Sequence, residues 1–546
     1  MDKTPTNTKK VFFSGVLLLT LSAFLVKLIG LVYKIPMLSY LGSEGMGYFH
    51  AAYEIYALFC IIATAGLPVA LSVLISEAVA KGRAGDTERI YRAAFLVFLL
   101  LGVIGTLVMW LGADVFCNLI KSENARSCIV SIAPTVLCVC VSSAIRGYFQ
   151  GYQRMLPTAL SQLIEAVGKL VFGLAFAHLA LERGADTQTV AAAAGWGLTL
   201  GTMVSMLYLF FEKARVRYCA RRKDTDSFQK DVVPIASVWK HLGRLAIPMT
   251  LGASLVSLTK IVDMAMILRR LQVIGYSEAL ANEAYGSYTT LALSVYGVLP
   301  TLLNSVFLPL VPMLSAAIAS GDREQQAHMV ESAYRLTAAF AIPASLGIAA
   351  FSRPVLSLLF RGEGEAVATA APLLSVLGAS VFLSCMISAS NSVLHAYRIV
   401  NRPILSLIAG AAVKIPVAYL LIGIPSVGLM GAPVSTLACN LVVVVLNLAF
   451  ASKQCGGVSV RDVFVRPLWL STLAVGVPFG LYLFFLNRFG ENDVMALPFI
   501  LLAVVLYAVL GLVGEVLTRE DIAALPFGEQ ICTLLTRFHL LTRQKK

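Results

Sequence analysis

The sequence predicts an all-α protein that crosses a membrane many times, and three features of its composition support that prediction. Of the 546 residues, 58% are hydrophobic and 13% are charged, whereas soluble domains average about 45–50% and about 25%. The mean hydropathy, averaged over the whole chain, is +0.81. The apolar residues are therefore not confined to one membrane anchor. These values exclude an ordinary soluble protein.

Apolar segments recur along the chain, and each is long enough for a helix that crosses a hydrocarbon core, which takes about 20 residues. They lie at residues 11–36, 48–75, 92–112, 128–152, 156–181, 188–211, 243–268, 286–315, 331–351, 367–393, 402–424, 428–450, 467–487 and 494–515. The sequence therefore predicts a polytopic membrane protein with about 14 transmembrane helices. The first segment is expected to stay as a helix, because it carries Lys27 and Lys34 and no small-residue cleavage site follows it.

The chain repeats itself at an offset of about 232–246 residues, with small gaps. The matching positions are Lys27 with Lys260, Pro68 with Pro300, 76–82 with 315–321, Pro134 with Pro372, Tyr152 with Tyr397, Pro157 with Pro403, and Lys169 with Lys414. Because these matches occur in the same order along both halves of the chain, they predict two six-helix repeated bundles, followed by two C-terminal helices. Because each bundle has an even number of helices, both share one orientation, as in transporters whose halves are related by an axis along the membrane normal.

The predicted domains follow from this repeat and from the charge distribution. They are a bundle at 1–211, a basic cytoplasmic linker at 212–242, a second bundle at 243–450, a two-helix extension at 451–515, and a cytoplasmic amphipathic basic tail at 516–546. Most of the 43 Lys and Arg residues fall on the side of the N-terminus, which predicts that both termini are cytoplasmic. The net charge of +13 is therefore interpreted as membrane anchoring, with no nucleic acid as a partner.

Ionisable residues inside the predicted spans are the candidate substrate-binding residues of a central cavity, because a charge is costly in lipid. They are Lys27, Lys34, Glu54, Arg146, Glu165, Lys169, Lys260, Asp263 and Lys414. Glu165 with Lys169, and Lys260 with Asp263, have spacings that allow each pair to neutralise itself on one helix face. Such local ion pairs are the structural alternative to a functional role.

Excess positive charge within the membrane favours an anionic substrate over a cationic one. Lys27 and Lys34 are seven residues apart and share a helix face, with Glu54 on the next predicted helix. Lys34 could instead extend to the membrane interface, and Arg146 could anchor the cytoplasmic end of its helix. A lysine ammonium would bind the phosphate of a lipid headgroup as a point charge.

The sequence offers no catalytic or metal site. Gly168 and Lys169 lack the remaining residues of a phosphate-binding loop. The six His residues are scattered, and Cys138 and Cys140 point to different faces of one helix. We therefore expect neither an enzyme nor a cofactor.

Several segments together resemble the stage V sporulation protein B branch of the polysaccharide-transporter family. They are the segment RGYFQGYQRMLPTALSQLIE at 146–165, Lys34-Ile-Pro, the turn GSEGMG at 42–47, and Gly66-Leu-Pro. That branch belongs to the superfamily of multidrug, oligosaccharidyl-lipid and polysaccharide flippases and is close to the lipid II flippases. The resemblance covers essentially the whole chain.

The resemblance implies alternating-access transfer of an undecaprenyl-linked peptidoglycan or polysaccharide precursor across a bacterial plasma membrane. The implied partners are an undecaprenyl-pyrophosphate-linked saccharide and membrane lipids. Many family members carry Ser-Arg-x-x-Gly-x-x-Arg-Asp on the first helix; Lys27 and Gly30 match it, whereas Tyr33 occupies the second Arg position. The family's central basic residue corresponds to Lys260 or to Arg269-Arg270.

Two other hypotheses fit the same sequence. A cation-coupled multidrug antiporter would use Asp263 or Glu54 as its ion site. A membrane scaffold that transports nothing would recruit cell-wall synthesis proteins through the 212–242 linker and the tail. It would tolerate reversal of the charges in the spans.

Overall fold

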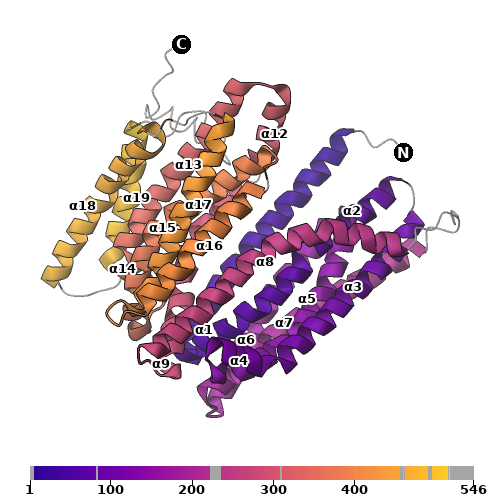
Figure 1. The fold of residues 1–546 in the computed structure, drawn as a ribbon, viewed down its shortest axis with the longest axis horizontal. Helices are drawn as coiled ribbons and strands as arrows, with labels where there is room; N and C mark the ends of the chain where they lie inside the picture. Colours follow the sequence, from indigo (N-terminus) through magenta and orange to yellow (C-terminus); the bar gives the residue numbers. More distant parts are fainter. Residues whose placement is uncertain are drawn as a thin grey trace. The chain divides into compact units, whose positions relative to one another are not determined.

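The computed structural model describes residues 5–81, 84–221, 235–307, 310–399, 401–455, 459, 461–489, 495–514 and 516. These residues form helices joined by short turns, with no strand among them. By their contacts they divide into two compact units, Met1–Gly286 (unit 1) and Ser287–Lys546 (unit 2), whose helices are labelled in Figure 1. The predicted all-α fold class is confirmed. The tail predicted at 516–546 lies, except for residue 516, outside the described residues.

Unit 1 is built around a group of long helices that lie side by side. Its elements are α1 (Pro5–Thr64), α2 (Leu67–Ala80), α3 (Ala84–Leu111), α4 (Ala113–Ile120), η1 (Glu123–Ala125), α5 (Arg126–Gly151), α6 (Met155–Glu182), α7 (Thr187–Arg221), α8 (Ile235–Val273) and α9 (Glu278–Ser287). The helix α6 packs along α7, and α1 contacts α5, α6, α7 and α8 (Figure 1).

The helix α1 consists of two helices that meet at Gly42. The backbone of Gly42 has φ 64° and ψ 176°, a conformation outside the helical region that glycine adopts at little steric cost. Pro36 lies inside the helix shortly before this break, where it removes one backbone hydrogen bond. The first two predicted segments therefore join at a sharp break, without an intervening loop.

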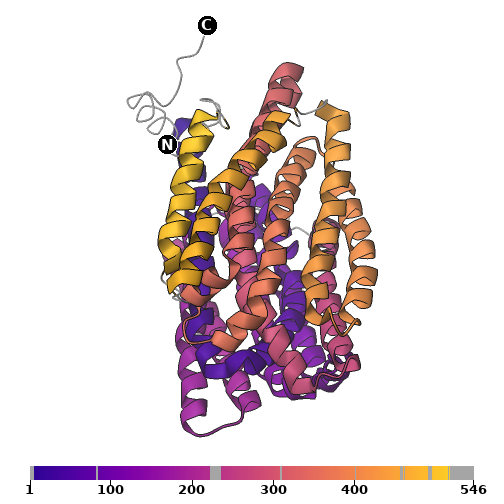
Figure 2. The same cartoon turned by 90° about the vertical axis from the view of Figure 1, so that its left-hand side faces the viewer.

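Unit 2 begins with short helices and continues with longer ones. Its elements are the π-helix η2 (Tyr288–Ala292), α10 (Leu293–Tyr296), α11 (Val298–Phe307), α12 (Leu310–Ser320), α13 (Arg323–Ala350), α14 (Ser352–Leu359), α15 (Gly364–Ala396), α16 (Asn401–Ile422), η3 (Gly428–Met430), α17 (Gly431–Cys455), η4 (Arg461–Val465), α18 (Arg466–Phe489) and α19 (Ala496–Val513). The last two helices lie side by side, as Figure 2 shows.

Twelve helical stretches among the described residues are long and apolar enough to cross a membrane. The first of them, Leu21–Ala80, is 60 residues long and contains two of the predicted segments. The predicted segment at 286–315 is the exception, because η2, α10 and α11 divide it into short helices. The other predicted segments each coincide with one of these stretches, which agrees with the prediction of about 14 helices.

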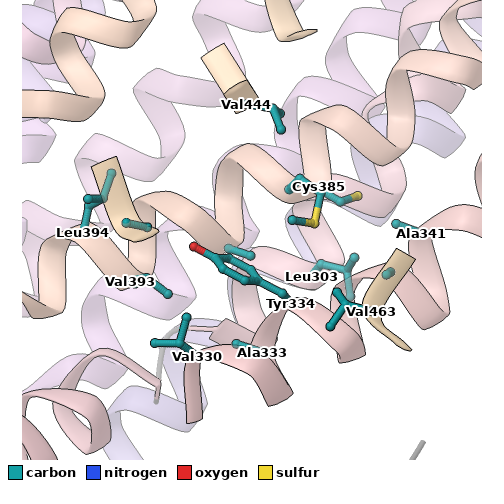
Figure 3. Packing of buried hydrophobic residues seen from close by; sticks show 14 of the residues in the cluster. Leu303, Val330, Ala333, Tyr334, Ala341, Cys385, Val393, Leu394, Val444 and Val463 are labelled. Atoms are coloured by element: carbon teal, nitrogen blue, oxygen red, sulfur yellow. The ribbon is translucent and has the colours of Figure 1, made fainter. Parts of the chain in front are cut away.

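Unit 2 contains an apolar cluster formed by side chains from several of its helices. Leu303 of α11, Tyr334 of α13, Cys385 of α15 and Val444 of α17 are buried together, and Figure 3 shows the Tyr334 ring among aliphatic side chains. Close van der Waals contacts of this kind hold helices together in a membrane. In unit 1, α2, α3, α5 and α7 bury a corresponding cluster.

The two units repeat the same helices. Both α3 and α13 have 28 residues, and both α4 and α14 have 8. The helices α5 and α15 contain Pro134 and Pro372, which the sequence pairs, and they end at Tyr152 and Tyr397. The residue after each tyrosine has a left-handed backbone, with φ 58° at Gln153 and 60° at Arg398.

The paired tyrosines make equivalent contacts. The hydroxyl groups of Tyr152 and Thr87 of α3 are 2.7 Å apart, and the Tyr397 hydroxyl donates to Gln326 of α13 over 3.1 Å. Each bond fixes the end of one helix to the start of another. The predicted domain boundaries stay predictions, and by its contacts α8 groups with unit 1, where it packs along α1, α2 and α3.

Candidate functional site

Eight of the nine predicted site residues lie in unit 1, on four helices. Lys27, Lys34 and Glu54 are on α1, Arg146 is on α5, Glu165 and Lys169 are on α6, and Lys260 and Asp263 are on α8, while Lys414 is on α16 of unit 2. The structure gathers most of the unit 1 residues into two clusters. We name them the Arg146 cluster and the Glu54 cluster.

Glycines bring α6 and α7 close together at the level of the charged residues. A Cβ on Gly168 of α6 would lie 2.7 Å from the Cα of Gly201 on α7, and a Cβ on Gly197 would overlap the Cα of Gly173. Small residues at such a crossing let the two backbones approach. Glu165 and Lys169 flank this contact on α6, so the packing fixes where their side chains emerge.

The Arg146 cluster consists of Arg146, Glu165, Lys169, Ser161 and Ser205. The Glu165 carboxylate binds Arg146 Nη2 over 2.8 Å through one oxygen and Lys169 Nζ over 2.7 Å through the other. Arg146 Nε also donates to Ser161 Oγ over 2.9 Å. The three charged side chains are 13–22% exposed. Both carboxylate oxygens are thus engaged, which satisfies a buried charge, and the cluster carries one excess positive charge.

The Glu54 cluster joins α1 to α8. Lys260 Nζ lies 4.0 Å from Glu54 Oε1, with the Lys260 side chain 58% exposed and Glu54 21% exposed. Electrostatic interactions also connect Glu54 to Lys34 and Asp263, and Lys34 to His50. Two lysines from different helices therefore converge on one carboxylate.

Three polar atoms of α1 in this region are buried without a hydrogen-bond partner among the described residues. They are Tyr33 Oη, His50 Nε2 and Glu54 Oε2. His50 and Glu54 are one helical turn apart, and the whole His50 residue is 9% exposed. Buried polar atoms without partners cost about 1–3 kcal/mol each. Such atoms have hydrogen-bonding capacity that the described side chains leave unused.

Tyr53 of α1 lies between the two clusters. It interacts electrostatically with Lys169 and Glu165 of the Arg146 cluster and with Glu54. Its ring packs against Tyr56 with centroids 5.5 Å apart and against Phe49 with centroids 6.3 Å apart. The Tyr53 side chain is therefore close to charged groups of both clusters.

Two predicted residues, Lys27 and Lys414, are not among the contacts described above for the two clusters. Lys27 is exposed on α1, two helical turns before Lys34. Lys414 belongs to unit 2. Within the described residues, no group of three or more His, Cys, Asp or Glu side chains could hold a metal ion.

Sequence reasoning missed Tyr33, His50, Tyr53, Ser161 and Ser205. For two of them the sequence spacing could have predicted the position. His50 lies four residues before Glu54, and Ser161 lies four residues before Glu165, so each shares a helix face with a predicted site residue. Ser205 gave no such signal, since its place beside Arg146, with Nη2 3.4 Å from Oγ, depends on how α7 packs against α5.

A model of the polysaccharide biosynthesis protein family matches residues 12–318. The chain belongs to this family. Stage V sporulation protein B of Bacillus subtilis (strain 168) is 24% identical over 446 residues, which cover 82% of this chain and 84% of that protein. Lipid II flippase MurJ of the same organism is 24% identical over 440 residues, which cover 78% and 79%.

Solved structures of transporters share the fold. Lipid II flippase MurJ in an inward closed conformation matches with a TM-score of 0.69 at 15% identity, over 91% of this chain and 98% of that chain. An inward-facing multidrug resistance MATE family transporter of the MOP superfamily matches with a TM-score of 0.61 at 15% identity, over 79% and 94%. The predicted resemblance to the polysaccharide-transporter branch of this superfamily is confirmed.

For this member of the polysaccharide biosynthesis protein family, Arg269 and Lys260, both considered for the central basic position, make different contacts. Arg269 Nε and Nη2 donate to the carbonyl oxygens of Leu119 and Asn118, over 2.6 and 3.2 Å, at the end of α4. Arg269 therefore caps a helix C-terminus. Lys260 Nζ lies 4.0 Å from Glu54 Oε1 instead.

Proposed function

We propose that this chain is an alternating-access flippase of a bacterial plasma membrane, with both termini cytoplasmic. Its substrate is an undecaprenyl-linked oligosaccharide or a peptidoglycan precursor that resembles lipid II, moved from the inner to the outer leaflet for cell-wall, spore-cortex or polysaccharide synthesis. Lys34 and Lys260 bind the phosphate groups of the headgroup. Arg146, Lys169 and Glu165 hold the surrounding helices and add one positive charge.

One observation carries this proposal: Lys34 and Lys260, which lie on different helices, both interact with Glu54 inside a membrane-spanning unit. Lysines that face a bilayer interior are costly unless a counter-charge meets them. A lipid phosphate offers the same negative oxygens as a carboxylate and can enter sideways from a leaflet. The arrangement therefore suits an anionic lipid headgroup better than a cationic drug.

The names of the relatives support the substrate class. A stage V sporulation protein and a lipid II flippase each share about a quarter of their residues with most of this chain. Both names concern cell-wall or spore processes, and the family description concerns polysaccharide synthesis. These relations favour a lipid-linked saccharide among anionic lipids.

Headgroup protection in proteoliposomes tests the proposal. A fluorescent undecaprenyl-pyrophosphate-linked sugar is loaded into both leaflets, and a membrane-impermeant quencher reports how fast the inner pool becomes accessible. Wild-type protein is expected to remove the protection of this lipid and to leave an ordinary labelled phospholipid protected. Lys34→Ala and Lys260→Ala are each expected to slow the exchange about tenfold or more, because a charged hydrogen bond contributes about 1.5–3 kcal/mol.

Lys81→Ala is the matched control, because Lys81 is an exposed lysine at the end of α2 and its removal is expected to change nothing. Exchange that continues unchanged in both cluster variants would remove Lys34 and Lys260 from the proposed site. Absence of any lipid exchange, with cation-dependent export of a drug, would favour the multidrug antiporter. Absence of all transport would favour the scaffold.

A further inference from the structure

The two buried glutamates of unit 1 differ in how their oxygens are held. Both oxygens of Glu165 lie within 2.8 Å of a cation. Glu54 has one oxygen 4.0 Å from Lys260 Nζ, and its Oε2 is buried without a hydrogen-bond partner among the described residues. Glu54 is thus the loosely held carboxylate, with one oxygen that can accept a proton without breaking an existing bond.

Charge balance limits what the Glu54 cluster can bind. The groups that interact with Glu54 are Lys34, Lys260 and Asp263, so two ammonium groups face two carboxylates. An incoming phosphate competes with Glu54 for the same ammonium groups. If the phosphate takes over both ammonium groups, the displaced Glu54 carboxylate is left without a cation, which is strongly unfavourable away from water.

A proton can remove that cost. Taking a proton from water onto Oε2 converts the Glu54 carboxylate to a neutral carboxylic acid, which offsets one of the negative charges that the phosphate group brings to the cluster. The other titratable groups near Glu54 are His50 and Tyr53 on α1, with Lys169 and Glu165 of α6 reached through Tyr53. Glu165 is already bound by two cations, so Glu54 is the carboxylate best placed to change its charge.

We propose that Glu54 is an internal counter-anion that holds Lys34 and Lys260 while no substrate is bound, and that binding of an anionic lipid headgroup drives protonation of Glu54. Proton and substrate then bind cooperatively, because each favours the other by the same free energy. This inference rests on the proposed function, since it assigns a coupled proton to the same site.

Counting protons during ligand binding tests the inference without any transport. Purified protein in detergent and weak buffer is mixed with undecaprenyl pyrophosphate, and a pH indicator measures the protons taken up per bound lipid. Wild type is expected to take up about one proton more than Glu54→Gln, whose amide cannot be protonated. The affinity of wild type is expected to rise up to about tenfold for each unit of pH decrease, and that of Glu54→Gln to rise less.

Two further variants separate this role from a structural one. Glu365→Gln changes an exposed acid in the first turn of α15 and is expected to keep the full proton uptake. Glu54→Asp keeps a carboxylate and is expected to restore uptake. Infrared difference spectra of wild type are expected to gain a protonated-carboxyl band on ligand binding, and this band is expected to be absent from Glu54→Gln.

The outcomes are distinguishable. If undecaprenyl pyrophosphate binds wild type but causes no more proton uptake than it causes in Glu54→Gln, the coupling is overturned. The flippase proposal then still stands. Failure of wild type to bind it at all overturns the proposed phosphate site and the inference that depends on it. A Glu54-dependent proton uptake on binding, together with the infrared band, establishes the coupling.

Discussion

The two units build the same three-helix packing around different chemistry. In unit 1, Thr135 of α5 and Thr199 of α7 share a hydrogen bond of 2.6 Å. In unit 2, Asn440 of α17 donates to Ser380 of α15 over 2.8 Å. Both bonds are neutral, and each joins two helices of its own unit.

Further along these helices, unit 1 has charged side chains where unit 2 has uncharged residues. At the offset of 245 residues that pairs Tyr152 with Tyr397, Arg146 falls on Asn391 and Glu165 falls on Gly410 in unit 2. Asn447 Nδ2 donates to Asn391 Oδ1 over 2.9 Å and to Ser390 Oγ over 3.2 Å. An amide pair thus stands where unit 1 has a charged cluster.

This difference separates what the fold needs from what the site needs. Since neutral amides hold α15 and α17 in unit 2, the same packing in unit 1 does not require charges. A buried ionic cluster is weak evidence for stability, because the desolvation of each ion offsets the attraction between them. We infer that the charges of the Arg146 cluster serve the electrostatics of the neighbouring Glu54 cluster.

Removing one charge from the Arg146 cluster gives the largest expected effect. Glu165→Gln leaves Arg146 and Lys169 without their shared carboxylate, and breaking a buried pair in this way costs about 3–5 kcal/mol. We expect a large decrease in the midpoint of thermal unfolding, measured on the purified protein in detergent. The counterpart variant Asn391→Ala is expected to cost about 0.5–1.5 kcal/mol, because it removes a neutral hydrogen bond.

A double variant sharpens this comparison. Arg146→Asn combined with Glu165→Gln leaves Lys169 as the one charged side chain of the Arg146 cluster, whereas Glu165→Gln alone leaves two cations that repel each other. The double variant is therefore expected to be more stable than Glu165→Gln alone. Equal losses from Glu165→Gln and Asn391→Ala, or further destabilisation by the second change, would show that the two centres are energetically equivalent and would contradict the inference.

The fold could be predicted from the sequence because its signals are local or periodic. Apolar length predicts each spanning helix, and the paired prolines and tyrosines predict the repeat, since Pro134 and Pro372 sit inside equivalent helices that end at Tyr152 and Tyr397. The break at 286–315 was missed, because hydropathy does not report where a helix is interrupted.

The clusters could be predicted only in part. The contact of Glu165 with Lys169 follows from their spacing on one helix. The approach of Lys260 to Glu54 depends on how α8 packs along α1, and one sequence contains no signal for that packing. The same holds for the buried atoms of Tyr33 and His50, whose missing partners are a tertiary property.

Closer packing at the glycine crossing is expected to have an intermediate effect. A Cβ on Gly201 would lie 2.5 Å from the backbone nitrogen of Lys169, so Gly201→Ala is expected to push α7 away from α6 at a cost of about 1–3 kcal/mol. Gly476→Ala in α18 is the matched control, because nothing lies within 4 Å of its Cβ position. The same unfolding assay is expected to show no loss for that control. Tolerance of alanine at Gly201 would mean that this crossing does not position Lys169.

The paired tyrosines give the smallest expected effect and the strictest test of the repeat. Tyr152→Phe and Tyr397→Phe each remove one hydroxyl that joins a helix end to a neighbouring helix, which is expected to cost about 0.5–1.5 kcal/mol. Because the two bonds occupy equivalent places, the two losses are expected to agree within about 0.5 kcal/mol and to add in the double variant, as distant sites do. A large loss at one tyrosine alone would show that the difference between the units extends beyond the charged cluster to the helix ends. Equal losses would confine it to the positions of Arg146 and Glu165, where the chemistry of the two units diverges.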